Sequence, residues 1–306
     1  MTTRVLLTGA TGFVGSRVYP RLIDAGFEVR CASRNPERAA QLFPEGGGAP
    51  GHARSWVRLD VDDPSTLGPA LEDIDVVLYL VHAMGSHTEG DYAEVERRAA
   101  RNLSRAAAGA GVRHIVYLGG VEPAGPPSKH LQSRLETGRV LREGEVPTLE
   151  LRAGMIVGAG SESWQICCDL SRLPMMILPQ WLKTRSQPVD IHDVAAALTH
   201  AAGRSLSHSA IRDLPGPEVL TAREILEHIA AERGSNPLML EVPFLSPRIS
   251  SYWLRLVTRA DYAVARELIE GLTSDLLATQ PEIWPEMPTH ERTPLNRAMR
   301  RALHEM

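Results

Sequence analysis

The feature that most constrains this chain is a glycine-rich turn close to its first residue. A short apolar run, residues 5–7, predicts a buried strand, and three glycines follow it as Gly9-x-x-Gly12-x-x-Gly15. Apolar residues then recur at helical spacing from Val14 to Leu22. A strand, a tight glycine turn and a helix together form the first unit of a dinucleotide-binding fold. We therefore predict an α/β protein with a doubly wound parallel sheet, the Rossmann fold.

Each glycine has a physical role in such a turn. One permits the turn, one lets the backbone approach a pyrophosphate, and one lets helix and strand pack without a Cβ between them. The start of the helix presents free N–H groups to the phosphates. The residues predicted to contact the nucleotide here are Gly9, Thr11, Gly12, Phe13, Val14 and Gly15.

The end of the second predicted strand, residues 27–32, indicates which nucleotide is bound. NAD-binding versions carry an acidic residue near this point, which holds the ribose 2′-hydroxyl. This sequence has Ser33-Arg34 instead, and Arg38 follows one helical turn later. A hydroxyl beside a guanidinium suits a 2′-phosphate, so we predict NADP(H) rather than NAD. The alternative is that both arginines are solvated charges at the start of a helix.

Further candidates stand at the carboxyl ends of the later strands, where ligands of open α/β sheets bind. Asp60 is placed to accept a hydrogen bond from the adenine amine, and His82 either contacts a ribose or substrate or caps its own loop. The other predicted cofactor contacts are Val61, Leu80, Val81, Leu118, Gly119 and Ala153. Candidate substrate contacts are Met84, Gly120, Met155 and Trp164, with ordinary core packing as the alternative for the larger side chains.

Composition narrows the class of protein. The net charge of −4 over 306 residues argues against nucleic acid as the main partner. Apolar runs such as residues 76–81 are too short to cross a bilayer, and the chain enters its first strand too early for a signal peptide. Cys31, Cys167 and Cys168 have no metal-ligand spacing, so we expect no metal site and a cytoplasmic protein with reduced thiols. A homo-oligomer is possible.

Several motifs resemble one known family. They are Thr8–Gly15, Tyr79–Gly85, Val116–Gly120, His130–Arg134, Leu151–Gly158 and Gln187–Val194. With these the sequence resembles the atypical short-chain dehydrogenases/reductases, in their NmrA-like NAD(P)H-binding group, over roughly the first 220 residues and less specifically beyond them.

The sequence departs from the catalytic pattern of that superfamily. Active members use a Ser at the end of strand five and a Tyr-x-x-x-Lys pair on the next helix. Here Gly119 or Gly120 stands at the serine position, and His130-x-x-x-Arg134 has the spacing of the Tyr and Lys. Four residues apart on a helix places both on one face, so His130 and Arg134 are the candidate catalytic pair. An adjacent cation favours the neutral imidazole. Alternatively, Arg134 binds the nicotinamide ribose and His130 only fills space.

We predict that residues 1–160 form the nucleotide-binding core and residues 161–306 a smaller, mainly helical substrate-binding lobe, with 186–216 returning a strand and a helix to the core. Late in the chain, 247–257 and 261–272 suggest two amphipathic helices, and 281–294 an extended strap. The last residues, 297–306, carry Arg297, Arg300 and Arg301, which we interpret as a solvated helix face.

The resemblance implies an NADP(H)-dependent oxidoreductase acting on a small apolar carbonyl, quinone or enone. Two alternatives stay open. The chain is either a sensor or assembly factor that binds NADP(H) without turnover, or an isomerase or epimerase that retains its nucleotide.

Overall fold

The core of the molecule is a seven-stranded parallel sheet. The computed structural model describes residues 2–43, 54–81, 92–179, 183–242 and 274–306. The strand order is β11-β6-β5-β4-β1-β2-β3, and every adjacent pair is parallel. The order reverses between β1 and β4, and this switch point opens a crevice at the carboxyl ends of the strands. The strands are β1 (Arg4–Leu7), β2 (Glu28–Ser33), β3 (Ser55–Arg58), β4 (Val76–Tyr79), β5 (His114–Gly120), β6 (Thr148–Ala153) and β11 (Ala210–Asp213).

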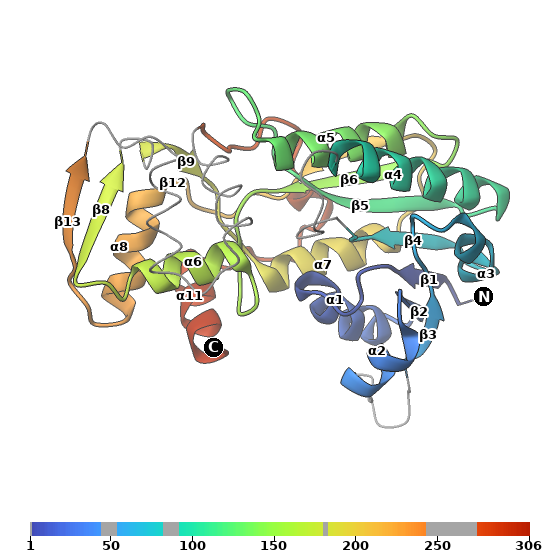
Figure 1. Ribbon diagram of the computed structural model, residues 1–306, viewed down its shortest axis with the longest axis horizontal. Helices are drawn as coiled ribbons and strands as arrows, with labels where there is room; N and C mark the ends of the chain where they lie inside the picture. The colour runs from blue at the N-terminus through green and yellow to red at the C-terminus, as the bar shows by residue number, and fades with distance from the viewer. Residues whose placement is uncertain (1, 44–53, 82–91, 180–182, 243–273) are drawn as a thin grey trace.

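Helices cover both faces of this sheet, as Figure 1 shows. On one face α1 (Phe13–Asp24) and α7 (Ile191–Ala202) pack on alternate strand residues such as Val5, Leu7 and Val116. On the other face lie α3 (Leu67–Leu71), α4 (Tyr92–Gly109) and α5 (Lys129–Arg142), over Leu6, Val77 and Ile115. The short helix α2 (Pro36–Leu42) follows β2, and a 3-10 turn, Pro64–Thr66, precedes α3. The predicted doubly wound fold is confirmed.

A smaller lobe extends from the carboxyl edge of the sheet. Its apolar core joins α6 (Glu162–Leu170), α8 (Ala222–Glu232) and α11 (Leu295–His304) around Trp164 and Met299. Three two-stranded sheets complete it. They pair β7 (Ile156–Val157) with β10 (Val189–Asp190), β9 (Arg185–Ser186) with β12 (Leu220–Thr221), and β8 (Met175–Pro179) with β13 (Leu238–Val242).

Several segments differ from their prediction. The fifth strand, which the sequence predicts over residues 112–118, continues through Gly119 and Gly120, because all seven residues of β5 are buried between β4 and β6. The apolar stretch around Met175 forms β8. Helix α11 has an exposed face with Arg297 and Arg300, and its other face buries Leu295, Ala298, Met299 and Ala302. Residues 281–294 contain a 3-10 helix, Trp284–Glu286, rather than only an extended strap. Residues 247–257 and 261–272 lie outside the described residues.

Local capping agrees with the sequence where it can be checked. Asn35 Oδ1 accepts a hydrogen bond from Arg38 N at 2.9 Å, and Thr221 and Glu224 form a reciprocal capping box. Among the described residues, no helix is both long and apolar enough to cross a membrane.

Candidate functional site

The glycine turn between β1 and α1 has the geometry of a phosphate cradle. Gly9 lies in the left-handed region with φ +64°, and Gly12 N donates to Gly9 O at 2.9 Å. A Cβ on Gly15 would lie 2.2 Å from Gly9 O, so only glycine fits there. No side chain caps α1 at Gly12, which leaves its first N–H groups available to a diphosphate. These residues therefore fit a nicotinamide dinucleotide.

A threonine fixes this turn against the neighbouring strand. The Thr8 hydroxyl donates to Leu78 O at 3.1 Å and accepts from Leu80 N at 2.9 Å. The end of β1 and the end of β4 are thereby tied together at the switch point of the sheet. Leu80 and Val81 lie at this edge, whereas His82 and Met84 lie outside the described residues.

The end of β2 carries the residues predicted to select the nucleotide. Arg34 and Arg38 are exposed, and the Ser33 hydroxyl turns to the backbone of Asn35. Arg17, the third arginine near this turn, pairs with Glu305 at 2.6 Å. The structure adds Arg58, which sequence reasoning missed: it is the register partner of Ser33 on β3, and only the strand pairing reveals it.

The residues predicted to contact the adenine follow β3. Asp60 Oδ1 accepts from Asp62 N at 3.1 Å, and Asn102 of α4 donates to Val61 O at 3.1 Å. The loop after β3 is thus held by its own backbone and by α4. Asp60 keeps its second carboxylate oxygen for the predicted contact with an amine.

A serine at the end of β5 would require neighbouring side chains to move. A Cβ on Gly119 would lie 2.9 Å from Glu150 Oε1, and one on Gly120 would lie 2.5 Å from Leu131 Cδ1. The ends of these two side chains occupy the space beside both glycines. Ala153, at the end of β6, accepts from Val121 N at 3.2 Å and holds the chain that leaves β5.

Helix α5 brings the candidate pair to this edge. Ser128 caps the helix by accepting from Leu131 N at 3.3 Å. Burial, and secondly the Arg134 charge, lower the pKa of His130 to about 4, so its imidazole is neutral near pH 7. Arg134 donates to Leu118 O, and its own carbonyl accepts from the Tyr117 hydroxyl at 3.1 Å. Burial raises the pKa of Tyr117, which is a core residue of β5.

A chain of linked, largely buried ion pairs connects β6 to α5 and to the segment after β5. Glu150 is fully buried on β6, with Arg142 Nε at 2.9 Å and Arg152 Nε at 2.8 Å. Arg152 in turn contacts Glu122, in the segment that connects β5 to α5, at 3.1 Å. Gly138 of α5 makes room for the Glu150 carboxylate. The signal in the sequence was a Glu and an Arg alternating with Leu149 and Leu151 in an apolar strand.

The segment after β6 packs against the glycine turn between β1 and α1. The ring of Phe13 lies against Gly158 and Gly160, where a Cβ would come within 3.0 and 3.3 Å of it, respectively. Met155 is partly buried and packs on the core of the smaller lobe. Trp164 is fully buried in that core, which fits its alternative as a packing residue, and we keep it as one.

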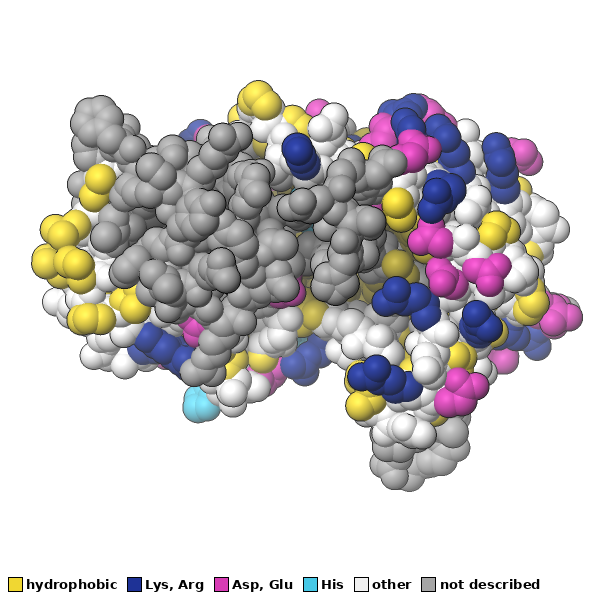
Figure 2. Space-filling model, viewed as in Figure 1, with side chains coloured by type: hydrophobic (Ala, Val, Ile, Leu, Met, Phe, Trp, Pro, Cys, Tyr) yellow, Lys and Arg dark blue, Asp and Glu magenta, His cyan; other side chains and the backbone are white. Residues whose placement is uncertain are grey.

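Charge on the described surface does not form a single-sign face in the view of Figure 2, where basic and acidic side chains are interspersed over the Rossmann core. The described residues hold no group of three or more His, Cys, Asp or Glu side chains that could bind a metal.

Comparison with known proteins identifies proteins that are similar to this chain in sequence or in structure. Residues 9–143 match the NAD(P)H-binding family. A (4-alkanoyl-5-oxo-2,5-dihydrofuran-3-yl)methyl phosphate reductase of Streptomyces griseus is 31% identical over 239 residues, 78% of this chain and 76% of that protein. An NmrA-like family domain-containing oxidoreductase of Aspergillus flavus is 28% identical over 50% of this chain and 48% of its own. The NADPH-dependent quinone oxidoreductase of Escherichia coli, in complex with NADPH, superposes with a TM-score of 0.75 at 19% identity, covering 97% of this chain and 98% of that one.

Proposed function

Because the chain belongs to the NAD(P)H-binding family of atypical short-chain dehydrogenases/reductases, in its NmrA-like group, we propose that it is an NADPH-dependent reductase of a small carbonyl, quinone or enone. The observation that carries the proposal is the juxtaposition at one sheet edge of an uncapped glycine cradle and α5 with a neutral imidazole and a guanidinium. The Streptomyces relative, a reductase of an unsaturated lactone phosphate, supports this class of substrate.

The chain's own residues would supply binding and electrostatics. The amides at the start of α1 hold the diphosphate, and Arg34 with Arg38 hold the 2′-phosphate. NADPH, when bound, supplies the hydride.

The substrate oxygen needs a partner as the hydride arrives. Electrons of the C=O bond, or of the conjugated C=C bond, move to that oxygen, where Arg134 and the neutral N–H of His130 can stabilise the charge. A neutral imidazole is a weak acid, so the final proton comes from water. The products are NADP and an alcohol, a hydroquinone or a saturated ketone.

The test is oxidation of NADPH by the purified full chain with a panel of quinones, enones, unsaturated lactones and aldehydes. We expect turnover with at least one class, a loss of kcat in Arg134→Ala with NADPH affinity retained, and no inflection from His130 between pH 6 and 8. Tight NADPH binding without oxidation across the panel would favour the sensor or assembly-factor alternative.

A further inference from the structure

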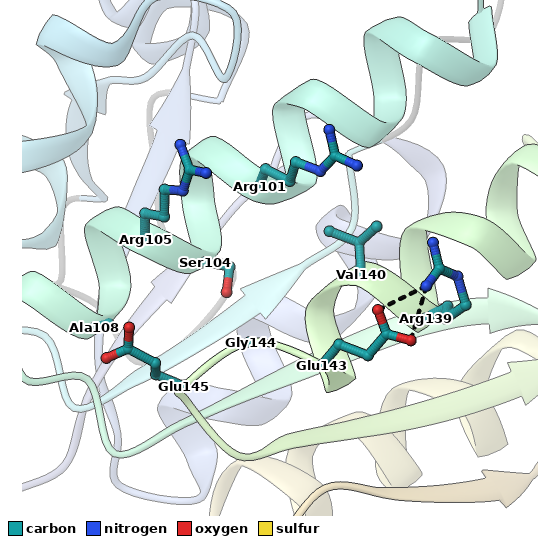
Figure 3. A pocket seen from close by; sticks show the side chains of 9 residues that line it. All are labelled: Arg101, Ser104, Arg105, Ala108, Arg139, Val140, Glu143, Gly144 and Glu145. Atoms are coloured by element: carbon teal, nitrogen blue, oxygen red, sulfur yellow. Dashed lines mark hydrogen bonds and ion pairs between the residues drawn. The ribbon is translucent and has the colours of Figure 1, made fainter.

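A second cavity lies far from the nucleotide site. It has a volume of about 390 Å³ and opens between the C-terminal half of α4 and the end of α5. Since α5 ends immediately before β6 begins, this cavity lies at the amino edge of the sheet, opposite to the glycine turn. Figure 3 shows its lining side chains: Arg101, Ser104, Arg105 and Ala108 from α4, and Arg139, Val140, Glu143, Gly144 and Glu145 from α5 and the following turn.

The arginines around this cavity divide into two groups. Arg97 and Arg98 of α4 pair with Glu94 and Asp62, and Arg139 of α5 is held between Glu136 and Glu143. Of the two acidic side chains that line the cavity, Glu143 is paired with Arg139, whereas Glu145 has no ion pair among the described residues.

Arg101 and Arg105 form the second group. Both are exposed, and neither has an ion pair within the described part of the chain. They stand four residues apart, so they extend from the same face of α4, as Figure 3 shows. Two like charges at this spacing repel each other and destabilise a helix, whereas an anion bound between them would attract both.

A hydroxyl group lies in the same cavity wall. In the sequence Ser104 stands between the two arginines. It is buried, and its side chain points toward Gly144 (Figure 3). A Cβ on Gly144 would lie 2.0 Å from Ser104 Oγ, so glycine is needed for the hydroxyl to occupy this place. Two guanidinium groups and a hydroxyl are the donors that proteins use for phosphate oxygens.

We propose that this cavity binds the phosphate group of a small phosphorylated molecule, with Arg101 and Arg105 as its charged ligands and Ser104 as a hydrogen-bond donor. The volume is near the lower end of the roughly 300–1,000 Å³ range of small-molecule sites, which suits a phosphate ester and not a dinucleotide. Glu145 at the rim, exposed and acidic, can accept from a hydroxyl of the organic part. The site is separate from the reductase site and stands whether or not that proposal holds.

The test is titration calorimetry at low ionic strength with the full chain saturated with NADP, so that the nucleotide site cannot bind the probe. The probes are inorganic phosphate and glycerol 3-phosphate. We expect saturable binding that weakens by at least about tenfold in Arg101→Ala/Arg105→Ala, corresponding to about 1.4 kcal/mol. Arg98→Ala, on the same helix but paired with Asp62, is the matched control and should retain the affinity of the parent chain.

Each outcome decides the proposal. Tighter binding of glycerol 3-phosphate than of inorganic phosphate assigns the site to an ester, and equal binding assigns it to free phosphate. Absence of saturable binding, or equal affinity in the double variant and the parent, overturns the proposal. A shift from dimer to monomer in the double variant, without phosphate binding, would instead assign this face to a second copy of the chain.

Discussion

Gly15 shows how a single missing side chain serves both the fold and the ligand. Its Cα lies so close to Gly9 O that a methyl group would come within 2.2 Å of that oxygen, and the contact is with backbone that has no rotamer to change. The sequence alone predicted this glycine from its spacing. The distance explains why no other residue can replace it.

Gly15→Ala is expected to destabilise the chain by about 1–3 kcal/mol through overpacking. It should also weaken NADPH binding by about tenfold or more, a change of about 1.4 kcal/mol. Fluorescence titration and denaturant unfolding measure the two effects. Gly109→Ala, where a Cβ meets nothing within 4 Å, is the matched control. Unchanged NADPH affinity in Gly15→Ala would contradict the cradle.

Arg34 carries the predicted preference for NADP(H). Arg34→Ala should lower NADPH affinity by roughly 10–100-fold, because a charge-assisted hydrogen bond contributes about 1.5–3 kcal/mol. NADH affinity should change little. Arg300→Ala, an exposed arginine paired with Glu232 in the smaller lobe, serves as the control. Equal losses for both nucleotides would assign Arg34 a structural role.

His130 makes stability depend on pH. Its folded pKa of about 4 lies below the ordinary 6.5, so the unfolded chain binds the proton more tightly. Above pH 6.5 His130 is neutral in both states and takes nothing from the free energy of unfolding. As the pH falls toward 4, the unfolded chain binds the proton first, so the free energy of unfolding decreases. Between pH 7 and 4.5 the free energy of unfolding should fall by about 1–2 kcal/mol more in the parent chain than in His130→Gln, allowing for partial exposure. Parallel pH profiles from urea unfolding would argue against the buried imidazole.

At the scale of elements, β6 and α5 are joined by an ion chain that periodicity could not predict. An apolar strand with charges at alternate positions reads as a half-exposed strand, yet Glu150 and Arg152 are buried beneath α5. Gly138 on the helix and Gly119 on β5 accept the carboxylate between them. The glycine at the serine position thus leaves room for a charged side chain of the next strand.

Glu150→Ala should destabilise the chain by about 3–5 kcal/mol, because it leaves Arg142 and the buried Arg152 without this shared partner. Glu143→Ala removes an exposed carboxylate from the C-terminal end of α5, beside Arg142, and should lower the free energy of unfolding by about 0.5 kcal/mol or less. Urea unfolding followed by circular dichroism compares the two. Equal losses in the free energy of unfolding would show that the ion pairs of Glu150 contribute no more than an exposed surface pair.

The sequence predicted the alternation of strands and helices and the glycine turn, because both are local patterns. It ended β5 too early, since Gly119-Gly120 has the composition of a turn, and only the neighbouring strands keep that pair extended. For α11 the sequence predicted only the exposed face that carries the arginines, whereas Ala298 and Met299 determine where that helix packs. The NAD(P)H-binding family is confirmed, whereas the preference for NADP(H) and the roles of His130 and Arg134 remain predictions.

At the scale of the whole molecule, the last segment of the chain ties the smaller lobe to the sheet. Ile283 and Trp284 are buried in the core beside α1 and α7, and Trp284 Nε1 donates to Pro215 O at 2.9 Å. Asp193 of α7 accepts from Thr293 N at 2.7 Å. Helix α11 then returns to α1 through Glu305 and Arg17. Residues distant in sequence thus meet the helix that starts the nucleotide cradle.

Asp213, the last residue of β11, is where this segment meets the sheet. Its Oδ2 accepts from Thr279 N at 2.7 Å and Gln280 N at 2.8 Å, whereas its buried Oδ1 has no partner among the described residues. Asp213→Ala removes the acceptor of both amides, and since Thr279 is exposed and Gln280 half-buried, the loss should be about 1–3 kcal/mol in total. Hydrogen exchange should then rise in residues 276–286.

The conservative variant makes this prediction specific. In Asp213→Asn one oxygen can still accept from both amides, and the amide nitrogen takes the place of an oxygen that had no partner, so the free energy of unfolding should stay within about 1 kcal/mol of the parent chain. The strands β4 and β5 should keep their exchange protection in both variants, because the ties to Asp213 do not reach them. Faster exchange in Asp213→Asn equal to that in Asp213→Ala, or exchange spread through β4 and β5, would mean that the carboxylate stabilises the sheet itself and not the segment that crosses its edge.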